Sequence, residues 1–181
     1  PHVKSNCHLE VEESPVPFAM GSKAELLQVL LNLVLNAAQA MQDRPKSQNS
    51  IVIRTGHDEK QIWIDVEDNG PGIPEGRLER VFEPFYTSKP VGKGSGLGLA
   101  VSRSLMDRMN GSLEVSSQLD RGTTFRVTLI ATPTSHQPNL GGLKTNQDAA
   151  KVLVITPEAR TVRGIKLWLK QHIVSHVDSV S

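Results

Sequence analysis

The sequence has a single cysteine, Cys7, so neither an internal disulfide nor a site built from several thiolates can form within the chain. Aromatic residues make up only 4% of it, and we therefore expect a core of Leu, Val and Ile. The charges nearly cancel, with 20 basic and 19 acidic side chains, which gives no basic footprint for nucleic acid or an anionic membrane. The longest apolar stretch, residues 26–41, is shorter than a bilayer span and carries amide side chains, so it is interpreted as a core helix.

These absences fit a soluble domain in a reducing, cytoplasmic setting. No secretory signal peptide opens the sequence. A parent protein could still be anchored in the inner membrane, or form a homodimer, through regions outside this sequence.

Two helices are expected from the apolar periodicity. Ser22 stands three residues before Glu25, the spacing of a capping box, and predicts a helix that runs to about Met41. A second helix is predicted from about Gly96 to the Asn110–Gly111 pair. It places four apolar residues on one stripe by i, i+4 spacing: Leu97, Val101, Leu105 and Met109.

Short alternating segments predict strands, the first of them an edge strand. Their approximate ranges are 8–12, 51–53, 62–66, 113–115 and 124–129. A hairpin loop is expected at 56–60, and a short helical piece at 78–82. The compact domain is predicted to cover residues 1–132, followed by a linker at 133–150 and a C-terminal appendage at 151–181.

Asn32 and Asn36 stand four residues apart inside the otherwise apolar first helix, so they share one face. Such a pair has two interpretations. Buried amides can simply bond to neighbouring backbone, or an amide oxygen can be a ligand for a hard cation such as magnesium.

A second polar feature, Asp68-x-Gly70-x-Gly72, directly follows a predicted strand. The carboxylate can accept a hydrogen bond from an exocyclic amine, and the glycines let a flat ligand approach the backbone. Asp-Asn-Gly is also an ordinary turn, so this motif alone does not decide.

The third feature is a glycine run, Gly94-x-Gly96-x-Gly98, that leads straight into the second helix. Glycines free the backbone amides to face a phosphate, and the helix N-terminus adds a favourable potential. A flexible loop would have the same composition. The run matches neither a Walker motif nor a Rossmann fingerprint.

In this order and spacing the motifs resemble the ATP-binding catalytic domain of two-component sensor histidine kinases, which have the Bergerat ATP-binding fold. Asn32–Asn36 resembles the N box and Asp68–Gly72 the G1 box. Phe82–Phe85 resembles the F box, Gly94–Gly98 the G2 box, and Gly122–Phe125 the last short motif.

The resemblance covers residues 8–130 and implies an α/β (α+β) two-layer sandwich. Its sheet would be mixed and mainly antiparallel, with helices on one face and ATP bound between the layers. The implied cofactors are ATP and Mg²⁺. The implied partners are a histidine-bearing dimerisation domain of the parent kinase and, indirectly, a response regulator.

The resemblance assigns roles residue by residue. Asn36 would ligate magnesium and Asn32 would support it, which makes them the catalytic pair. Asp68 would take the adenine amino group with Thr123 nearby, and Gly70 and Gly72 would allow the close turn.

At the phosphates, the resemblance implies a lid over residues 73–95, anchored by Phe82 and Phe85. The resemblance implies two kinds of phosphate contact. Backbone amides would come from the glycine run, at Gly94, Gly96, Leu97 and Gly98, and positive charge from Lys89 and Lys93. Solvated loop residues are the alternative interpretation of the two lysines.

Departures from the family pattern narrow the function. Gln39 stands where many such kinases have a basic residue, and Asn36–Met41 is similar to the nitrogen-regulation type of sensor kinase. ATPases of the same fold, such as type II topoisomerases, place a Glu base where this chain has Asn32, so hydrolysis is disfavoured. An anti-sigma-type serine kinase and a module that only senses nucleotide are two further functions compatible with this fold.

His57-Asp58 lacks the following proline of a phosphoacceptor motif and falls in a predicted hairpin loop, so the acceptor histidine is expected to lie outside this chain. The tail from Lys151 resembles the first strand and helix of a degenerate or truncated receiver domain. Thr156 and Pro157 stand where a receiver has acidic residues, and a simple appendage is the second interpretation.

Overall fold

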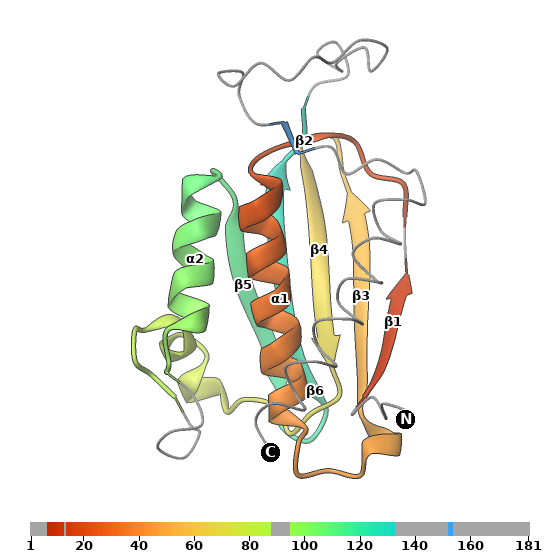
Figure 1. The fold of residues 1–181 in the computed structure, drawn as a ribbon, viewed down its shortest axis with the longest axis vertical. Helices are drawn as coiled ribbons and strands as arrows, with labels where there is room; N and C mark the ends of the chain where they lie inside the picture. The colour runs from red at the N-terminus through yellow and green to blue at the C-terminus, as the bar shows by residue number, and fades with distance from the viewer. Residues whose placement is uncertain (1–6, 13, 88–94, 133–151, 154–181) are drawn as a thin grey trace, which may run out of the picture.

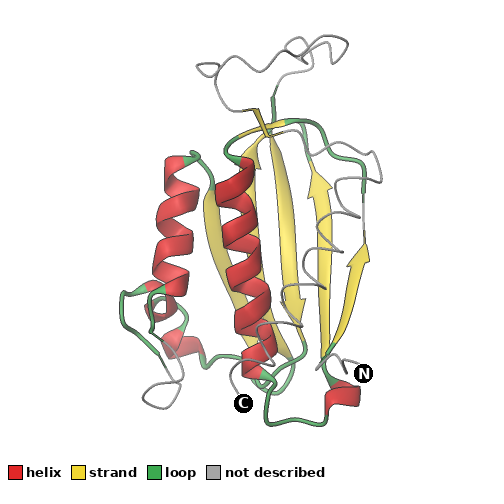
Figure 2. Cartoon of the chain, in the orientation of Figure 1, coloured by secondary structure: helices red, strands yellow, loops and turns green. Residues whose placement is uncertain are grey.

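The computed structural model describes residues 7–12, 14–87, 95–132 and 152–153, and every structural statement below refers to them. They form a two-layer sandwich, with a five-stranded sheet in the order β1-β3-β4-β6-β5 and two helices on one face (Figures 1 and 2). The strands are β1 (His8–Glu12), β3 (Ser50–His57), β4 (Gln61–Asp68), β5 (Ser112–Gln118) and β6 (Gly122–Ile130). The helices are α1 (Lys23–Ala40) and α2 (Gly98–Arg108).

The sheet is mixed and mainly antiparallel, as the sequence predicted. β1 lies at one edge and runs parallel to β3, whereas the other neighbouring strands are antiparallel. Short elements complete the fold: β2 (Ala19–Met20), β7 (Val152–Leu153) and the 3-10 helices η1 (Lys46–Gln48), η2 (Glu75–Arg77) and η3 (Arg80–Phe82). No helix in the described ranges is long and apolar enough to cross a membrane.

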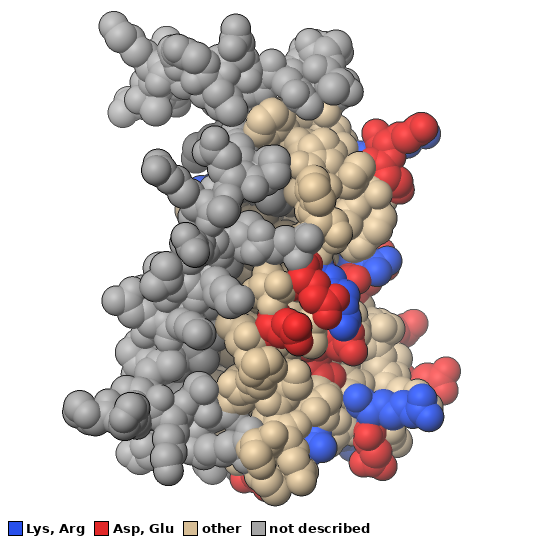
Figure 3. All heavy atoms as spheres, turned by 90° about the vertical axis from the view of Figure 1, so that its right-hand side faces the viewer, with Lys and Arg blue, Asp and Glu red and all other residues tan. Residues whose placement is uncertain are grey.

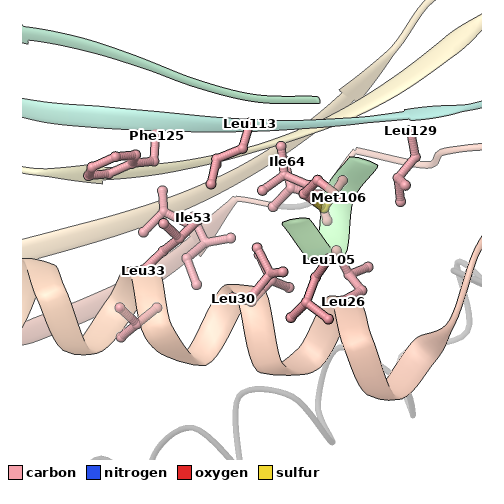
Figure 4. Packing of buried hydrophobic residues seen from close by; sticks show 14 of the residues in the cluster. Leu26, Leu30, Leu33, Ile53, Ile64, Leu105, Met106, Leu113, Phe125 and Leu129 are labelled. Atoms are coloured by element: carbon pink, nitrogen blue, oxygen red, sulfur yellow. The ribbon is translucent and has the colours of Figure 1, made fainter. Parts of the chain in front are cut away.

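The core lies between the helices and the sheet and is almost entirely aliphatic. Figure 4 shows side chains of α1 and α2 meeting those of the strands, among them Leu26, Leu30, Leu33, Ile53, Ile64, Leu105 and Met106. Phe125 is the one aromatic residue that is fully buried in the described part of the chain. The expected Leu, Val and Ile core is confirmed, with methionines added to it.

Local sequence signals account for the element boundaries. The hydroxyl of Ser22 accepts a hydrogen bond from the backbone N–H of Glu25 at 3.4 Å, so the predicted cap of α1 is present. The loop between β3 and β4 is shorter than predicted, because Asp58 Oδ1 accepts the N–H groups of Lys60 and Gln61 and closes a tight turn. Of the predicted helical piece at 78–82, only Arg80–Phe82 is helical, as the 3-10 helix η3, and a second 3-10 helix, η2, ends just before it at Arg77.

The predicted apolar stripe of α2 is wrong in its first half. Leu97 and Val101 are exposed, whereas Ser102 is 2% exposed and faces the core beside Leu105 and Met106. The helix is therefore rotated from the orientation that apolar periodicity predicts, and it directs a small polar residue towards α1.

The face of the sheet opposite the helices carries ion pairs. The guanidinium of Arg54 bonds to Glu12 at 2.8 Å and also to Glu67, and Arg126 makes two 2.7 Å bonds to Asp65. Acidic and basic side chains accordingly lie beside one another in the space-filling view (Figure 3). Exposed pairs of this kind contribute at most about 1 kcal/mol each, so they mark a solvated face rather than a source of stability.

Candidate nucleotide-binding site

The polar face of α1 lies against the first turns of α2. Asn32 Nδ2 donates a 2.9 Å hydrogen bond to the hydroxyl of Ser102. Gly98 is so close to Asn32 that a Cβ there would lie 2.4 Å from Asn32 Oδ1. Asn32 therefore ties the two helices together, and Asn36 is half-buried one turn further along the same face.

The start of α2 is an exposed helix N-terminus preceded by a strained turn. Gly96 has a φ of +65°, and a Cβ there would lie 2.5 Å from the carbonyl carbon of Phe85, so only glycine fits. The Gly96 carbonyl accepts the N–H of Phe85 at 2.9 Å. The first N–H groups of a helix have no partner within the helix and sit at its positive end, so the start of α2 at Gly98 suits an anionic ligand. The N–H of Leu97, just before the helix, is bonded to Ser95 Oγ at 3.3 Å.

Asp68 is a buried carboxyl at the end of β4. It is 5% exposed, and its Oδ1 accepts the N–H of Gly70 at 2.8 Å. Burial raises the pKa of Asp68 to about 6; the N–H groups of Gly70 and Thr123 and the cation of Arg44 oppose this rise, and Glu67 adds to it. A buried carboxyl with a raised pKa and few partners is typical of a functional site.

The loop after β4 is fastened to the end of the β5–β6 hairpin. Gly72 has a φ of +74° and lies against the carbonyl of Gln118. The hydroxyl of Ser117 accepts the N–H of Ile73 at 2.8 Å and lies 3.0 Å from Thr123 Oγ1. Asp68, Gly70, Gly72 and Thr123 therefore meet at one end of the sheet, as the sequence predicted.

The segment after Gly72 is anchored to the domain by one phenylalanine. The ring of Phe82 meets Phe125 edge-on, with centroids 6.4 Å apart, and the Arg103 guanidinium lies 5.0 Å from its centre. Phe85 is 73% exposed, so the prediction that its side chain is a second anchor is wrong, and only its backbone bonds to Gly96. Lys89, Lys93 and Gly94 lie outside the described residues, and their phosphate roles stay predictions.

Helix α1 connects the two groups of residues. Asn32 contacts Gly98 at the start of α2, and Met41 lies just beyond the other end of α1, where a Cβ on Gly70 would be 3.3 Å from Met41 Cγ. The rise of an α-helix sets these contacts about 13 Å apart, with Asn36 between them. An elongated ligand lying along α1 would thus meet a buried carboxyl at one end and a helix N-terminus at the other.

Three residues that support this arrangement were missed by sequence reasoning. Ser102 carried a weak signal, because it is polar on a helix whose neighbours are apolar. Ser117 continues the inward alternation of β5, which could have placed it beside Thr123. Arg44 gave no signal, since it lies in the irregular loop between α1 and β3.

Comparison with known proteins agrees with this geometry. Residues 21–133 match the sequence model of the family described as histidine kinase-, DNA gyrase B-, and HSP90-like ATPase. The C4-dicarboxylate transport sensor protein DctB of Pseudomonas aeruginosa is 33% identical over 121 residues, which are 67% of this chain and 19% of DctB. The sensory histidine kinase/phosphatase NtrB of Rhizobium leguminosarum is 37% identical over 136 residues, covering 67% of this chain and 34% of NtrB.

Comparison with solved structures indicates a similar relationship. The mycobacterial sensor histidine kinase MprB superposes with a TM-score of 0.60 at 29% identity, covering 71% of this chain and 84% of that one. Full-length ShkA in complex with AMPPNP superposes with a TM-score of 0.61 at 27% identity, covering 70% of this chain and 26% of that one.

The chain belongs to the histidine kinase-, DNA gyrase B-, and HSP90-like ATPase family, and both NtrB and MprB are named as sensory or sensor histidine kinases. It spans about a fifth of DctB and a third of NtrB. It therefore corresponds to the nucleotide-binding part of such proteins.

Proposed function

We propose that this chain binds Mg-ATP and transfers the γ-phosphoryl group to a histidine on a separate dimerisation domain of its parent, in two-component signal transduction. The observation that carries the proposal is the pairing, along α1, of a buried carboxyl with an exposed helix N-terminus. The parent's dimeric state, its response regulator and its attachment to the inner membrane belong to the same proposal, as does the cytoplasmic setting of this domain.

In this proposal the nucleotide lies along α1. Asp68 accepts a hydrogen bond from the exocyclic amine of adenine, with Thr123 beside it, and the N–H groups from Gly96 to Gly98 receive the phosphates. Guanine presents a carbonyl at the same edge and would leave the carboxylate facing another acceptor, so adenine is preferred. Lys89 or Lys93 supplies further positive charge.

Asn36 suits a magnesium ligand. The amide oxygen of Asn36 is a hard donor. Asn36 is half-buried and shares a face of α1 with Asn32, whose side chain bonds to Ser102 on α2. Magnesium would offset the charge of the phosphates, and Asn36 would fix the ion relative to α1.

The state of Asn32 favours transfer over hydrolysis. A water-activating base is needed for hydrolysis, and Asn32 is an amide whose NH₂ group is already bonded to Ser102. In transfer, a ring nitrogen of the acceptor histidine forms the new P–N bond while the bond between the γ-phosphorus and the bridging oxygen breaks and ADP leaves. That step depends on positioning and charge stabilisation, which this site offers without a base.

An exposed apolar patch at the start of α2 suits the acceptor domain. We call Phe85, Leu97 and Val101 the α2 patch; their exposed fractions are 73%, 37% and 43%. The N–H of Val101 bonds to the Leu97 carbonyl, so these two side chains share a face one turn apart, and Phe85 adjoins them through Gly96. Exposed apolar side chains beside a reactive site fit the apolar stripe of a partner helix.

The test is phosphoryl transfer from labelled ATP, with and without the purified helical dimerisation domain of the parent. We expect acid-labile, base-stable label on the dimerisation domain and none on this chain. Rapid phosphate release without an acceptor would favour ATP hydrolysis as the function, and label on this chain alone would place the acceptor here.

The same assay separates docking from chemistry. Val101→Gln should reduce transfer about tenfold through weaker docking, because it removes apolar contact area, and leave ATP affinity unchanged. Arg108→Gln, at the far end of α2, is the matched control and should leave both unchanged. Equal transfer by the Val101 variant would exclude the α2 patch as the docking surface.

Asn36→Ala should weaken ATP binding in magnesium buffer by roughly a hundredfold, because the ion loses a protein ligand. A water molecule can replace the amide oxygen, but it does not fix the position of the ion. Titration calorimetry with and without magnesium measures it, and the loss should shrink when the ion is chelated. Gln28→Ala, an exposed amide two turns earlier on α1, is the control. An equal loss in both buffers would mean that Asn36 acts on the fold and not on the ion.

A further inference from the structure

Asn69, between Asp68 and Gly70, fastens the turn that follows β4. Its Oδ1 accepts the N–H of Ser50 at 2.9 Å, and its Nδ2 donates to the carbonyl of Gln48 at 2.7 Å. The two ends of the side chain are therefore bonded to the first residue of β3 and to the last residue of η1. The peptide carbonyl of Asn69 accepts a hydrogen bond from Arg44 Nη1.

Arg44 reaches this carbonyl from the loop between α1 and β3. Its own N–H donates to the carbonyl of Met41 at 3.1 Å, and that carbonyl also accepts Asn49 Nδ2 at 2.9 Å. The loop is thus folded behind the turn, and the guanidinium is half-buried. The Coulomb interaction of a half-buried cation with a nearby charge is stronger than the same interaction in water, because the surrounding protein has a lower dielectric constant.

We propose that Arg44 is a positioning residue of the adenine-binding end of the site, acting through the Asn69 carbonyl on the turn from Asp68 to Gly70. The inference rests on the proposed function, in which Asp68 accepts the adenine amine. Arg44 lies outside the N, G1, F and G2 boxes and is not among the residues proposed to contact the nucleotide. Its role follows from the bond between Arg44 and the Asn69 carbonyl.

Arg44 also favours the charged form of Asp68, the form that can accept a hydrogen bond, although burial and the N–H groups of Gly70 and Thr123 affect the pKa of Asp68 more. The charged groups that act on Asp68 are Arg44, which lowers its pKa, and Glu67 on the same strand, which raises it. The residues opposite it on β3 and β6 are Ile51 and Thr123, which do not titrate near neutral pH. Removing the cation therefore raises the pKa of Asp68, so the carboxylate is lost at a higher pH.

The experiment compares Arg44→Gln and Arg44→Lys with Arg108→Gln, which removes the same charge at the far end of the helix layer. The first measurement is ATP affinity from pH 5 to 9. The second follows the carboxyl carbon of Asp68 by NMR titration in the nucleotide-free chain, with Asp68→Asn used for assignment.

We expect wild-type affinity to fall as the pH is lowered through about 6, the pKa of the Asp68 carboxyl. For Arg44→Gln the midpoint moves to higher pH, so the loss of ATP affinity relative to the wild type is larger near pH 6 than at pH 8.5. Arg44→Lys keeps the charge, so the pH midpoint of ATP binding stays near that of the wild type. It loses the planar guanidinium group, so ATP affinity falls modestly at every pH. Arg108→Gln matches the wild type in both measurements.

A uniform loss for Arg44→Gln at every pH, with an unchanged Asp68 titration, would overturn the inference and leave Arg44 a purely structural residue. A midpoint for Arg44→Lys that moves as far as that of Arg44→Gln would overturn it as well. Failure of the proposed function would look different: wild type would not bind ATP at any pH, while the NMR titration would still respond to Arg44→Gln.

Discussion

Replacing Asp68 with asparagine is expected to abolish high-affinity ATP binding and, at the same time, to make the folded chain more stable at neutral pH. The N–H groups of Gly70 and Thr123 both donate to the Asp68 carboxylate. An asparagine has a single acceptor oxygen, which the N–H of Gly70 would occupy, so its NH₂ group would replace the second carboxylate oxygen and face the adenine amine. Two donors then oppose each other, and we expect a loss of roughly a hundredfold in affinity.

The gain in stability follows from the pKa of about 6. Asp68 has a higher pKa when folded than when unfolded, so between these pKa values the folded state binds more protons and loses stability as the pH rises. Above pH 6 the full cost of holding the carboxylate in the core is present, on the order of 2–3 kcal/mol. Asp68→Asn removes that cost at pH 8 and changes little at pH 4, where Asp68 is already neutral.

Urea unfolding at pH 8 and at pH 4 measures this effect. Asp65→Asn is the matched control, because Asp65 lies on the same strand but on the solvent face, paired with Arg126. It should lose a small amount of stability at pH 8 and keep ATP affinity. A destabilised Asp68→Asn at pH 8 would show that Asp68 is a structural carboxylate, and its assignment to adenine would fail.

Gly122→Ala is expected to destabilise the fold by about 3–5 kcal/mol. Gly122 has a φ of +122°, and a Cβ there would lie 1.9 Å from the carbonyl oxygen of Asp68. This oxygen belongs to the backbone of β4, which is paired with β6, so the methyl group can be accommodated only by separating β4 from β6. That separation would also move Asp68 away from Thr123 and weaken nucleotide binding.

Gly76→Ala is the control for this substitution, since nothing lies within 4 Å of a Cβ at Gly76. It should change stability by less than about 0.5 kcal/mol in the same unfolding experiment. Equal effects of the two substitutions would mean that β6 begins differently in solution.

Much of the fold could be predicted because its signals are local. The Ser22 cap fixed the start of α1, and alternation along β4 separated the buried side chains from those in water. The order of the four motifs then identified the family, which residues 21–133 confirm. The meeting of Thr123 with Asp68 was expected only from the resemblance to that family, because the two residues belong to different strands.

The contacts that hold the site together could not be predicted, because they join segments far apart in the sequence. Asn32 bonds to Ser102 across 70 residues, and this contact sets the rotation of α2 that leaves Leu97 and Val101 exposed. Apolar spacing alone cannot reveal such a rotation, since it depends on a polar contact between the two helices. Arg44 was missed because no periodic pattern covers an irregular loop.

Strand β1 has a consequence for where this domain begins. The family match starts at residue 21, whereas β1 occupies His8–Glu12 and supplies the outer partner of β3. A chain that began at residue 21 would leave the whole length of β3 as a bare sheet edge, with unpaired amides and carbonyls open to another molecule. As an outer edge, β1 is less open to pairing than β3, because it is shorter and carries the exposed charge of Glu10. The segment before the matched region thus pairs with most of a strand that would otherwise be an open sheet edge.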